Sequence, residues 1–123
     1  ITKSTQKILY SPQRLLFKYA DDIKVKYKKY NSFKDFNQGT SNVLDSFEFL
    51  NWLKNKVNEA DDNMIEYTED SLLIDWNLIN NRIQAEIAAN LWGKDYRYYI
   101  RLKTDKQFQT ALENFHLAKS FVE

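Results

Sequence analysis

The fold class is decided by residues 72–91, which read LLIDWNLINNRIQAEIAANL. Apolar side chains recur there every three or four positions, which is the period of one face of an α-helix. They are Leu72, Trp76, Ile79, Ile83, Ile87 and Leu91. Thr68 is suited to cap the start of this helix, and Gly93 stands where a left-handed residue ends one. We therefore predict a long helix from about Thr68 to Trp92, against which the other helices pack.

The N-terminal part of the chain predicts another helix and then a loop. Ser11-Pro12 offers a capping hydroxyl and a ring suited to the first helical position. An apolar stripe follows at helical spacing, formed by Leu15, Leu16, Tyr19, Ile23 and Tyr27. This helix is expected to end near Tyr30. Residues 31–42 are interpreted as a loop, with Phe33 and Phe36 as its apolar anchors.

Two further helices are predicted by capping boxes, in which an acidic or hydroxyl side chain precedes Glu or Gln by three positions. The first begins at Asp45 with Glu48, and its expected buried stripe is Phe47, Leu50, Leu53 and Val57. The second begins at Thr104 with Gln107, and its stripe is Phe108, Ala111, Leu112 and Phe115. Residues 94–103 fit either a helix or a short strand. The prediction is an all-α domain, a small helical bundle of about four helices, with a strand or irregular segment near 94–103 left open.

Composition agrees with this fold class and excludes others. The chain has 123 residues, with two glycines, one proline and no cysteine. Sandwiches, barrels and doubly wound folds need many tight turns. The small number of glycines and prolines therefore argues against these folds. The lack of cysteine excludes disulfides, thiol catalysis and cysteine-bound metal. We predict a single helical domain, 1–123, and interpret it as a fragment of a larger protein because it starts at Ile1 without methionine.

Charge is unevenly distributed along the chain, although the net charge is only +1. Residues 1–35 carry nine basic and three acidic groups, residues 36–80 two and nine, and residues 81–123 seven and five. Opposite patches within one domain attract each other or flank a partner surface. Because the acidic block offsets the basic one, we do not expect a nucleic-acid partner.

Three patterns suggest chemistry, and each has a simpler structural explanation. Ser4 and Lys7 match the Ser-x-x-Lys pattern of some serine nucleophiles, but the companion motifs are absent. His116 is the only histidine, and with its neighbour Ser120 it makes an incomplete catalytic set. The acidic residues in 59–70 lack the calcium-loop pattern, so they are interpreted as a solvated turn. We therefore predict no catalytic residue, no metal ligand and no cofactor.

An interaction surface is the remaining candidate site. Four lysines alternate with Tyr27 and Tyr30, a combination that can bind nucleic acid but is also the ordinary end of an amphipathic helix. The chain has three tryptophans, eight tyrosines and eight phenylalanines, more than a small helical core needs, so some are expected at an interface. Trp76 and Trp92 are interpreted as core or docking residues. The predicted surface comprises Lys24, Lys26, Lys28, Lys29, Trp52, Tyr96, Tyr98 and Tyr99.

The order of segments resembles the C-terminal helical region of the tail-specific, or carboxyl-terminal processing, serine peptidases of bacterial cell envelopes. The resemblance covers about residues 10–115. It is carried by Leu15-Leu-Phe-Lys-Tyr-Ala20, Ser32-Phe-Lys-Asp-Phe36, the paired aromatics Phe47 and Phe49, the stretch from Glu86-Ile-Ala88 to Tyr98-Tyr99, and Leu102-Lys-Thr-Asp105 followed by Ala111-Leu112. No residue here matches the family's serine and lysine, which lie upstream of this region.

The resemblance implies a non-catalytic accessory domain that packs on the protease core of its parent chain or on a second copy. It implies that the parent is a serine-type endopeptidase of the periplasm or cell envelope, with protein substrates. The alternative is a free-standing helical interaction module, with weak nucleic-acid binding through the Lys24–Lys29 helix end. No stretch of the sequence approaches eighteen apolar residues, so no membrane-spanning segment is predicted.

Overall fold

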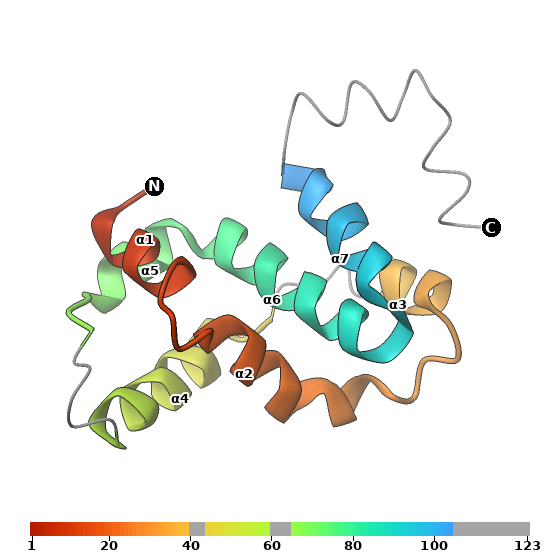
Figure 1. Cartoon of the computed structure of the whole chain (residues 1–123), viewed down its shortest axis with the longest axis horizontal. Coiled ribbons are helices and arrows are strands. Elements are labelled where there is room, and N and C mark those ends of the chain that lie inside the picture. The colour runs from red at the N-terminus through yellow and green to blue at the C-terminus, as the bar shows by residue number, and fades with distance from the viewer. Residues whose placement is uncertain (40–43, 60–64, 105–123) are drawn as a thin grey trace.

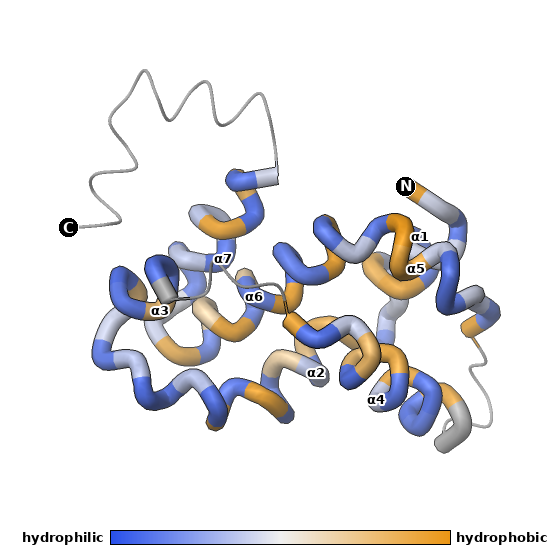
Figure 2. The backbone as a smooth tube through the Cα atoms, turned by 180° about the vertical axis from the view of Figure 1, so that it is seen from behind, coloured by the Kyte–Doolittle hydropathy of each residue, from blue (hydrophilic) through white to orange (hydrophobic). Residues whose placement is uncertain are grey.

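The computed structural model describes residues 1–39, 44–59 and 65–104, and these residues confirm the predicted all-α class. They form seven α-helices and two short 3₁₀ helices (Figure 1). The elements are α1 (Lys3–Leu9), α2 (Leu15–Ile23), η1 (Lys24–Tyr27), α3 (Phe33–Gly39), α4 (Ser46–Glu59), α5 (Glu69–Ile74), α6 (Trp76–Trp92), α7 (Lys94–Arg101) and η2 (Leu102–Thr104). Hydrophilic and hydrophobic stretches alternate along these helices, as amphipathic packing requires (Figure 2).

Helix α6 is the centre of the domain, as its apolar period predicts. It runs through the middle of the molecule, with α2 along one side and α7 folded back against its end (Figure 1). The side chains of Ile79, Ile83 and Ile87 are completely buried. Because the surrounding helices cover it from several directions, Asn81 is buried too, and its side-chain amide donates to the Ile100 carbonyl oxygen at 2.7 Å.

The predicted helix from Thr68 to Trp92 is interrupted at Asp75, so it is two helices rather than one. Thr68 caps the first of them as predicted, since its Oγ1 accepts from the Ser71 N–H at 3.3 Å. Asp75 leaves the helical conformation, with φ −97° and ψ 17°. Its carboxylate accepts from the backbone N–H of Thr2 at 2.8 Å. This contact with a distant segment is the physical reason that sequence periodicity did not indicate the break.

The N-terminal helix begins later than predicted and is preceded by one that was missed. Ser11 does not cap a helix, because its Oγ accepts from the Gln13 N–H at 3.1 Å within a turn. Helix α2 follows from Arg14, whose backbone is left-handed with φ 53° and ψ 53°. The helix ends at Ile23 and continues only as the 3₁₀ turn η1. The missed helix, α1, packs on α5.

Residues 33–39 form helix α3, so part of the predicted loop 31–42 is helical. Ser32 starts it, since its Oγ accepts from the Asp35 N–H at 3.3 Å. Phe33 and Phe36 are buried, which confirms them as the apolar anchors of this segment. A helix of seven residues gives too short a period to be recognised in the sequence.

Helix α4 has the predicted cap, and of its predicted stripe Leu50 and Leu53 are buried while Val57 packs against the core. Asp45 Oδ1 accepts from the N–H groups of Phe47 and Glu48, at 2.9 and 3.4 Å. Phe47 was predicted in the buried stripe, yet 72% of its surface is exposed, whereas Phe49 is completely buried. Phe49 takes the buried position instead of Phe47 because it packs edge-on against Tyr19, with ring centroids 5.0 Å apart.

Residues 94–101 are the helix α7, which excludes the strand alternative for this segment. Gly93 alone separates it from α6, and its φ of +121° is a conformation that other residues rarely adopt. Gly93 does end the long helix, as predicted, but its ψ of 155° places it outside the left-handed helical conformation that was expected. The predicted C-terminal helix with Phe108, Leu112 and Phe115 lies outside the described residues.

Candidate interaction surface

Two of the four predicted surface lysines are paired with carboxylates. The Lys24 ammonium lies 2.7 Å from Asp21, one helical turn earlier, and that of Lys26 lies 3.6 Å from Glu48 of α4. Both pairs are partly solvated, where an ion pair contributes little to stability. Their positive charge is offset locally, so a polyanion would meet a weaker field here than the lysine run suggests.

The other two lysines extend from the turn after η1 and are exposed. The Lys29 ammonium lies 5.4 Å from the centroid of the Tyr30 ring. Tyr27 and Tyr30 are half-buried and stack on each other with centroids 6.5 Å apart. Lys28 and Lys29 are therefore the accessible cations of the run, and the tyrosine rings mainly support the fold beneath them.

Trp52 joins α4 to α2 and is half-buried rather than free on the surface. Its indole N–H donates to Asp22 at 2.8 Å, and its ring packs 5.1 Å from Tyr19. The Lys56 ammonium lies 5.8 Å from the indole centroid. Burial raises the pKa of Tyr19 to about 12, so this phenol stays protonated beneath the indole.

The three predicted tyrosines of α7 divide between core and surface. Tyr96 stacks on Phe33 with centroids 4.3 Å apart, and Tyr99 meets the same ring edge-on at 5.5 Å. Tyr99 is 8% exposed, while Tyr98 is 58% exposed. Of the three, Tyr98 presents the accessible ring, and the structure does not bring it together with Trp52 and the lysine run as one surface patch.

Large apolar side chains that were not predicted as surface residues are exposed at several places. They include Ile1, Tyr10, Val25, Phe47 and Ile74, each more than 60% exposed. Monomeric domains tolerate single exposed apolar residues, so each alone means little. Phe47 is notable because its helix buries Phe49 and leaves this second ring in solvent. The only signal in the sequence is the surplus of aromatic residues, which does not say which of them is exposed.

The catalytic patterns gain no supporting geometry in the described part of the chain. The Ser4 hydroxyl oxygen accepts from the Thr68 N–H at 3.0 Å, so it links α1 to the start of α5, and Lys7 is exposed. Within residues 1–39, 44–59 and 65–104, no group of three or more His, Asp or Glu side chains could hold a metal ion. His116, Ser120 and residues 60–64 of the acidic turn lie outside the described residues.

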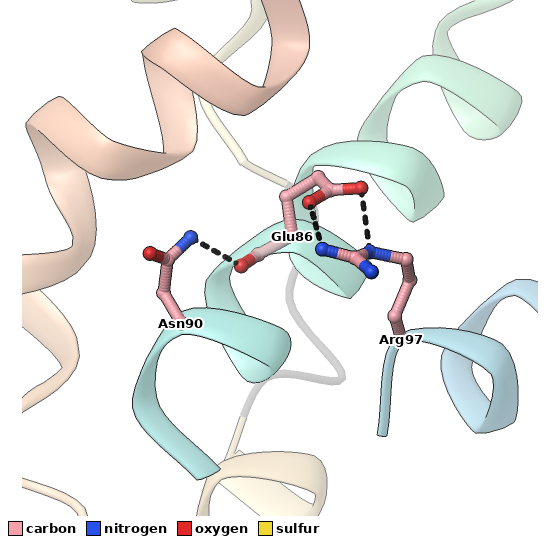
Figure 3. A network of polar contacts seen from close by, with 3 residues as sticks. All are labelled: Glu86, Asn90 and Arg97. Atoms are coloured by element: carbon pink, nitrogen blue, oxygen red, sulfur yellow. Dashed lines mark hydrogen bonds and ion pairs between the residues drawn. The ribbon is translucent and has the colours of Figure 1, made fainter. Parts of the chain in front are cut away.

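One polar network between α6 and α7 is less exposed than the surface lysines. Arg97 at the start of α7 donates two hydrogen bonds to the Glu86 carboxylate of α6, at 2.9 and 3.0 Å (Figure 3). Asn90 donates to the Glu86 backbone carbonyl at 2.9 Å. Both charged side chains are at least three-quarters buried, with 18% and 24% of their surface exposed. The pair fixes how α7 folds back on α6.

Comparison with protein-family models, with curated proteins and with solved structures gives no match for this chain. Among the described residues, no helix is both long and apolar enough to cross a bilayer.

Proposed function

We propose that the chain is a non-catalytic, C-terminal helical accessory domain of a bacterial envelope serine peptidase of the tail-specific type. In this role it packs on the protease core of its parent or mediates assembly with a second copy. The proposal places the parent in the periplasm or cell envelope, acting on protein substrates. It rests on the segment order that resembles this family, and the all-α fold is compatible with it.

The observation that best supports a docking role is the exposed ring of Phe47. Helix α4 has a complete buried face of its own, because Phe49, Leu50 and Leu53 are each at most 4% exposed. Phe47 lies outside that face, and aromatic rings are enriched where one protein surface contacts another. Tyr98 on α7 is exposed in the same way.

The first test is genetic and asks what the natural gene encodes before Ile1. A protease core with a serine–lysine pair, encoded in the same reading frame, supports the proposal. A start codon directly at this point would overturn it. The second test mixes the chain with that core and measures complex formation by sedimentation velocity. Phe47→Ser is expected to weaken the complex, whereas Lys54→Ser, on the exposed side of the same helix, is the control and should leave it unchanged.

A free-standing module that binds nucleic acid is the second candidate, and the exposed Lys28 and Lys29 favour it. Phosphate contacts would make binding to single-stranded DNA fall steeply as salt rises. Replacing both lysines by glutamine should then abolish binding at about 50 mM salt. If the unmodified chain does not bind at this salt concentration, the second candidate is excluded.

A further inference from the structure

The connection between α6 and α7 is a single residue, Gly93. Its φ of 121° and ψ of 155° lie in a region of backbone conformation that essentially only glycine adopts. Because of this turn, α7 folds back beside the end of α6 (Figure 1). A hinge of one residue that needs a glycine conformation has no slack, and short strained hinges favour the exchange of an element between two copies of a chain.

Helix α7 is held by side chains that precede the hinge in the chain. We call α7 the arm, and we call the surface formed by Phe33, Asn81 and Glu86 the seat. Tyr96 of the arm stacks on Phe33 with ring centroids 4.3 Å apart. Arg97 donates two hydrogen bonds to the Glu86 carboxylate, at 2.9 and 3.0 Å (Figure 3). The Asn81 amide donates to a backbone carbonyl of the arm at 2.7 Å. These contacts join and leave the seat together when the hinge changes.

A second copy of the chain offers the same seat to the same arm. If Gly93 takes a helical conformation, α6 and α7 become one continuous helix, and the arm points away from its own seat. The sequence permits this, because the single proline is Pro12, far from residues 76–101. The pairs of residues 81 with 100 and 86 with 97 are spaced about equally on either side of Leu91. Two straightened helices related by a two-fold axis near Leu91 would therefore form the same pairs between copies.

A straightened chain needs that second copy, because its own seat would be left open. Phe33, Tyr99 and Ile100 are each at most 8% exposed in the closed form, and straightening alone would bring them into water. The Glu86 carboxylate would also lose its two hydrogen bonds from Arg97. An arm from another copy restores all of these contacts. Since the ring contacts must first be absent, exchange takes place when two copies fold together rather than by local opening of a folded chain.

We propose that α7 is an exchangeable arm, and that two copies of the chain form a dimer in which the arm of each copy occupies the seat of the other. Gly93 sets the balance, because its turned conformation gives the closed monomer and its helical conformation gives the exchanged dimer. The inference goes beyond the proposed function and does not rest on it, since it needs no peptidase. It supplies a physical route by which the chain assembles with a second copy.

The first test reverses one charge of the arm or of the seat. Glu86→Arg and Arg97→Glu each put two like charges at positions where the natural side chains are only 18% and 24% exposed. The two full-length variants are unfolded together in urea and refolded as an equal mixture. Only the exchanged heterodimer then has opposite charges in both seats. Native mass spectrometry resolves the two masses and should show at least about tenfold more heterodimer than either homodimer.

The matched control carries Glu86→Arg and Arg97→Glu in one chain, so that opposite charges meet in the closed form. Refolded alone, it should be mainly monomeric at the concentrations where the parent is. If this control folds and the mixture of single variants contains no more heterodimer than random pairing gives, the proposal is wrong. If the control does not fold, the hinge variant described next decides.

Gly93→Ala tests the hinge without changing the seat. Among the described residues, nothing lies within 4 Å of the position that a Cβ at Gly93 would take, so alanine creates no clash there. Alanine disfavours the turned conformation and favours a helix, which moves the balance toward the exchanged dimer. After refolding at a series of concentrations, sedimentation velocity should show a dimer dissociation constant about tenfold or more below that of the parent. Lys94→Ala, the matched control at the next, exposed position, should leave this constant within about twofold.

Two results with Gly93→Ala would overturn the proposal. The first is a chain that refolds but is no more dimeric than the parent. The second is a dimer that forms equally well when Glu86→Arg or Arg97→Glu is added to both copies, because the contact would then lie outside the seat; its loss on Phe47→Ser would place it on α4. An exchanged dimer that does not bind a protease core leaves this inference standing and the proposed function refuted. Binding to the core by a chain that never exchanges its arm gives the opposite outcome.

Discussion

The two ends of α6 are attached to their neighbours by different kinds of contact. At the C-terminal end, aromatic rings of α3, α6 and α7 pack against one another with centroids 4.3 to 6.4 Å apart. These rings belong to Phe33, Phe36, Trp92, Tyr96 and Tyr99. At the N-terminal end the described residues show one ring contact, between Trp76 and Phe49 at 5.7 Å. There α1 docks through hydrogen bonds from the Thr2 N–H to Asp75 and from the Thr68 N–H to Ser4. We call these regions the aromatic end and the polar end.

The difference between the aromatic end and the polar end indicates where the free energy of folding is concentrated. Each aromatic ring removes a large apolar area from water, and ring–ring geometry adds to that. A hydrogen bond that remains in contact with solvent contributes much less, because water can replace the lost partner. The polar end should therefore open locally while the aromatic end stays closed, which is the usual gradient of stability within a domain.

The largest expected effect comes from Phe36→Ala at the aromatic end. Phe36 is completely buried and meets Trp92 at 5.1 Å, so truncation removes ring contacts and leaves a cavity. We expect the free energy of unfolding to fall by about 3–5 kcal/mol. Phe47→Ala removes the same ring from a position that is 72% exposed and should cost less than about 0.5 kcal/mol. Urea melts of the two variants decide whether burial, rather than residue type, sets the cost.

Ile83→Ala tests the segment of α6 that both ends share. Ile83 is completely buried, and the loss should be about 2–5 kcal/mol in urea melts. Because this residue supports both ends, the whole domain should lose stability in one transition. Lys28→Ala, at an exposed position, should change the free energy of unfolding by less than about 0.5 kcal/mol. A parent-like melt for Ile83→Ala would contradict the placement of α6 at the centre of the fold.

Sequence periodicity predicted the spine better than either end, since α3 was expected as part of a loop and α7 was left open between helix and strand. The all-α class, the buried face through Ile79, Ile83 and Ile87, and the two anchors Phe33 and Phe36 depend on local spacing, which a sequence displays. The break at Asp75 depends on a contact with Thr2, and no local pattern carries that information.

The candidate surface was also predicted only in part, because local spacing does not show tertiary contacts. Lys28, Lys29 and Tyr98 were predicted and are exposed, but Tyr99 is in the core because its face of α7 turns toward Phe33. Trp52 of α4 contacts Tyr19 and Asp22 of α2, and this contact is a tertiary property that local spacing does not display. Arg14 had one unusual feature, a left-handed backbone, which residue type does not reveal.

Asp75→Asn is expected to loosen the polar end without unfolding the aromatic end. The hydroxyl of Thr5 and the backbone N–H of Thr2 hydrogen-bond the Asp75 carboxylate and hold its pKa below the ordinary 3.8. The unfolded chain therefore takes up this proton first as pH falls, so the contribution is fully present above about pH 4 and is lost below the lowered pKa. Near neutral pH the variant should lose about 1 kcal/mol, and hydrogen exchange should speed up in α1 more than in α7.

The pH dependence supplies the control for this variant. The difference in unfolding free energy between the parent and Asp75→Asn should shrink as pH is lowered through the range below 3.8, because the parent then loses its carboxylate. A difference that stays constant down to acid pH would mean that the Asp75 charge does not hold α1. Equal acceleration of exchange in α1 and α7 would mean that the two ends open together.

Ser4→Ala should have the smallest effect, because it removes one hydrogen bond at a solvated position. We expect a loss of less than about 0.5 kcal/mol, since water can satisfy the Thr68 N–H. Combined with Asp75→Asn, it should add almost nothing, because both contacts serve the same docking of α1 and one of them is already lost. Urea melts of the single and double variants measure this coupling, and strict additivity would show that α1 is held at two independent points.

A serine-reactive probe applied to the parent should not label Ser4, whose oxygen accepts a backbone hydrogen bond. Labelling that disappears in Ser4→Ala would instead make this residue a nucleophile, contradicting its structural role at the polar end.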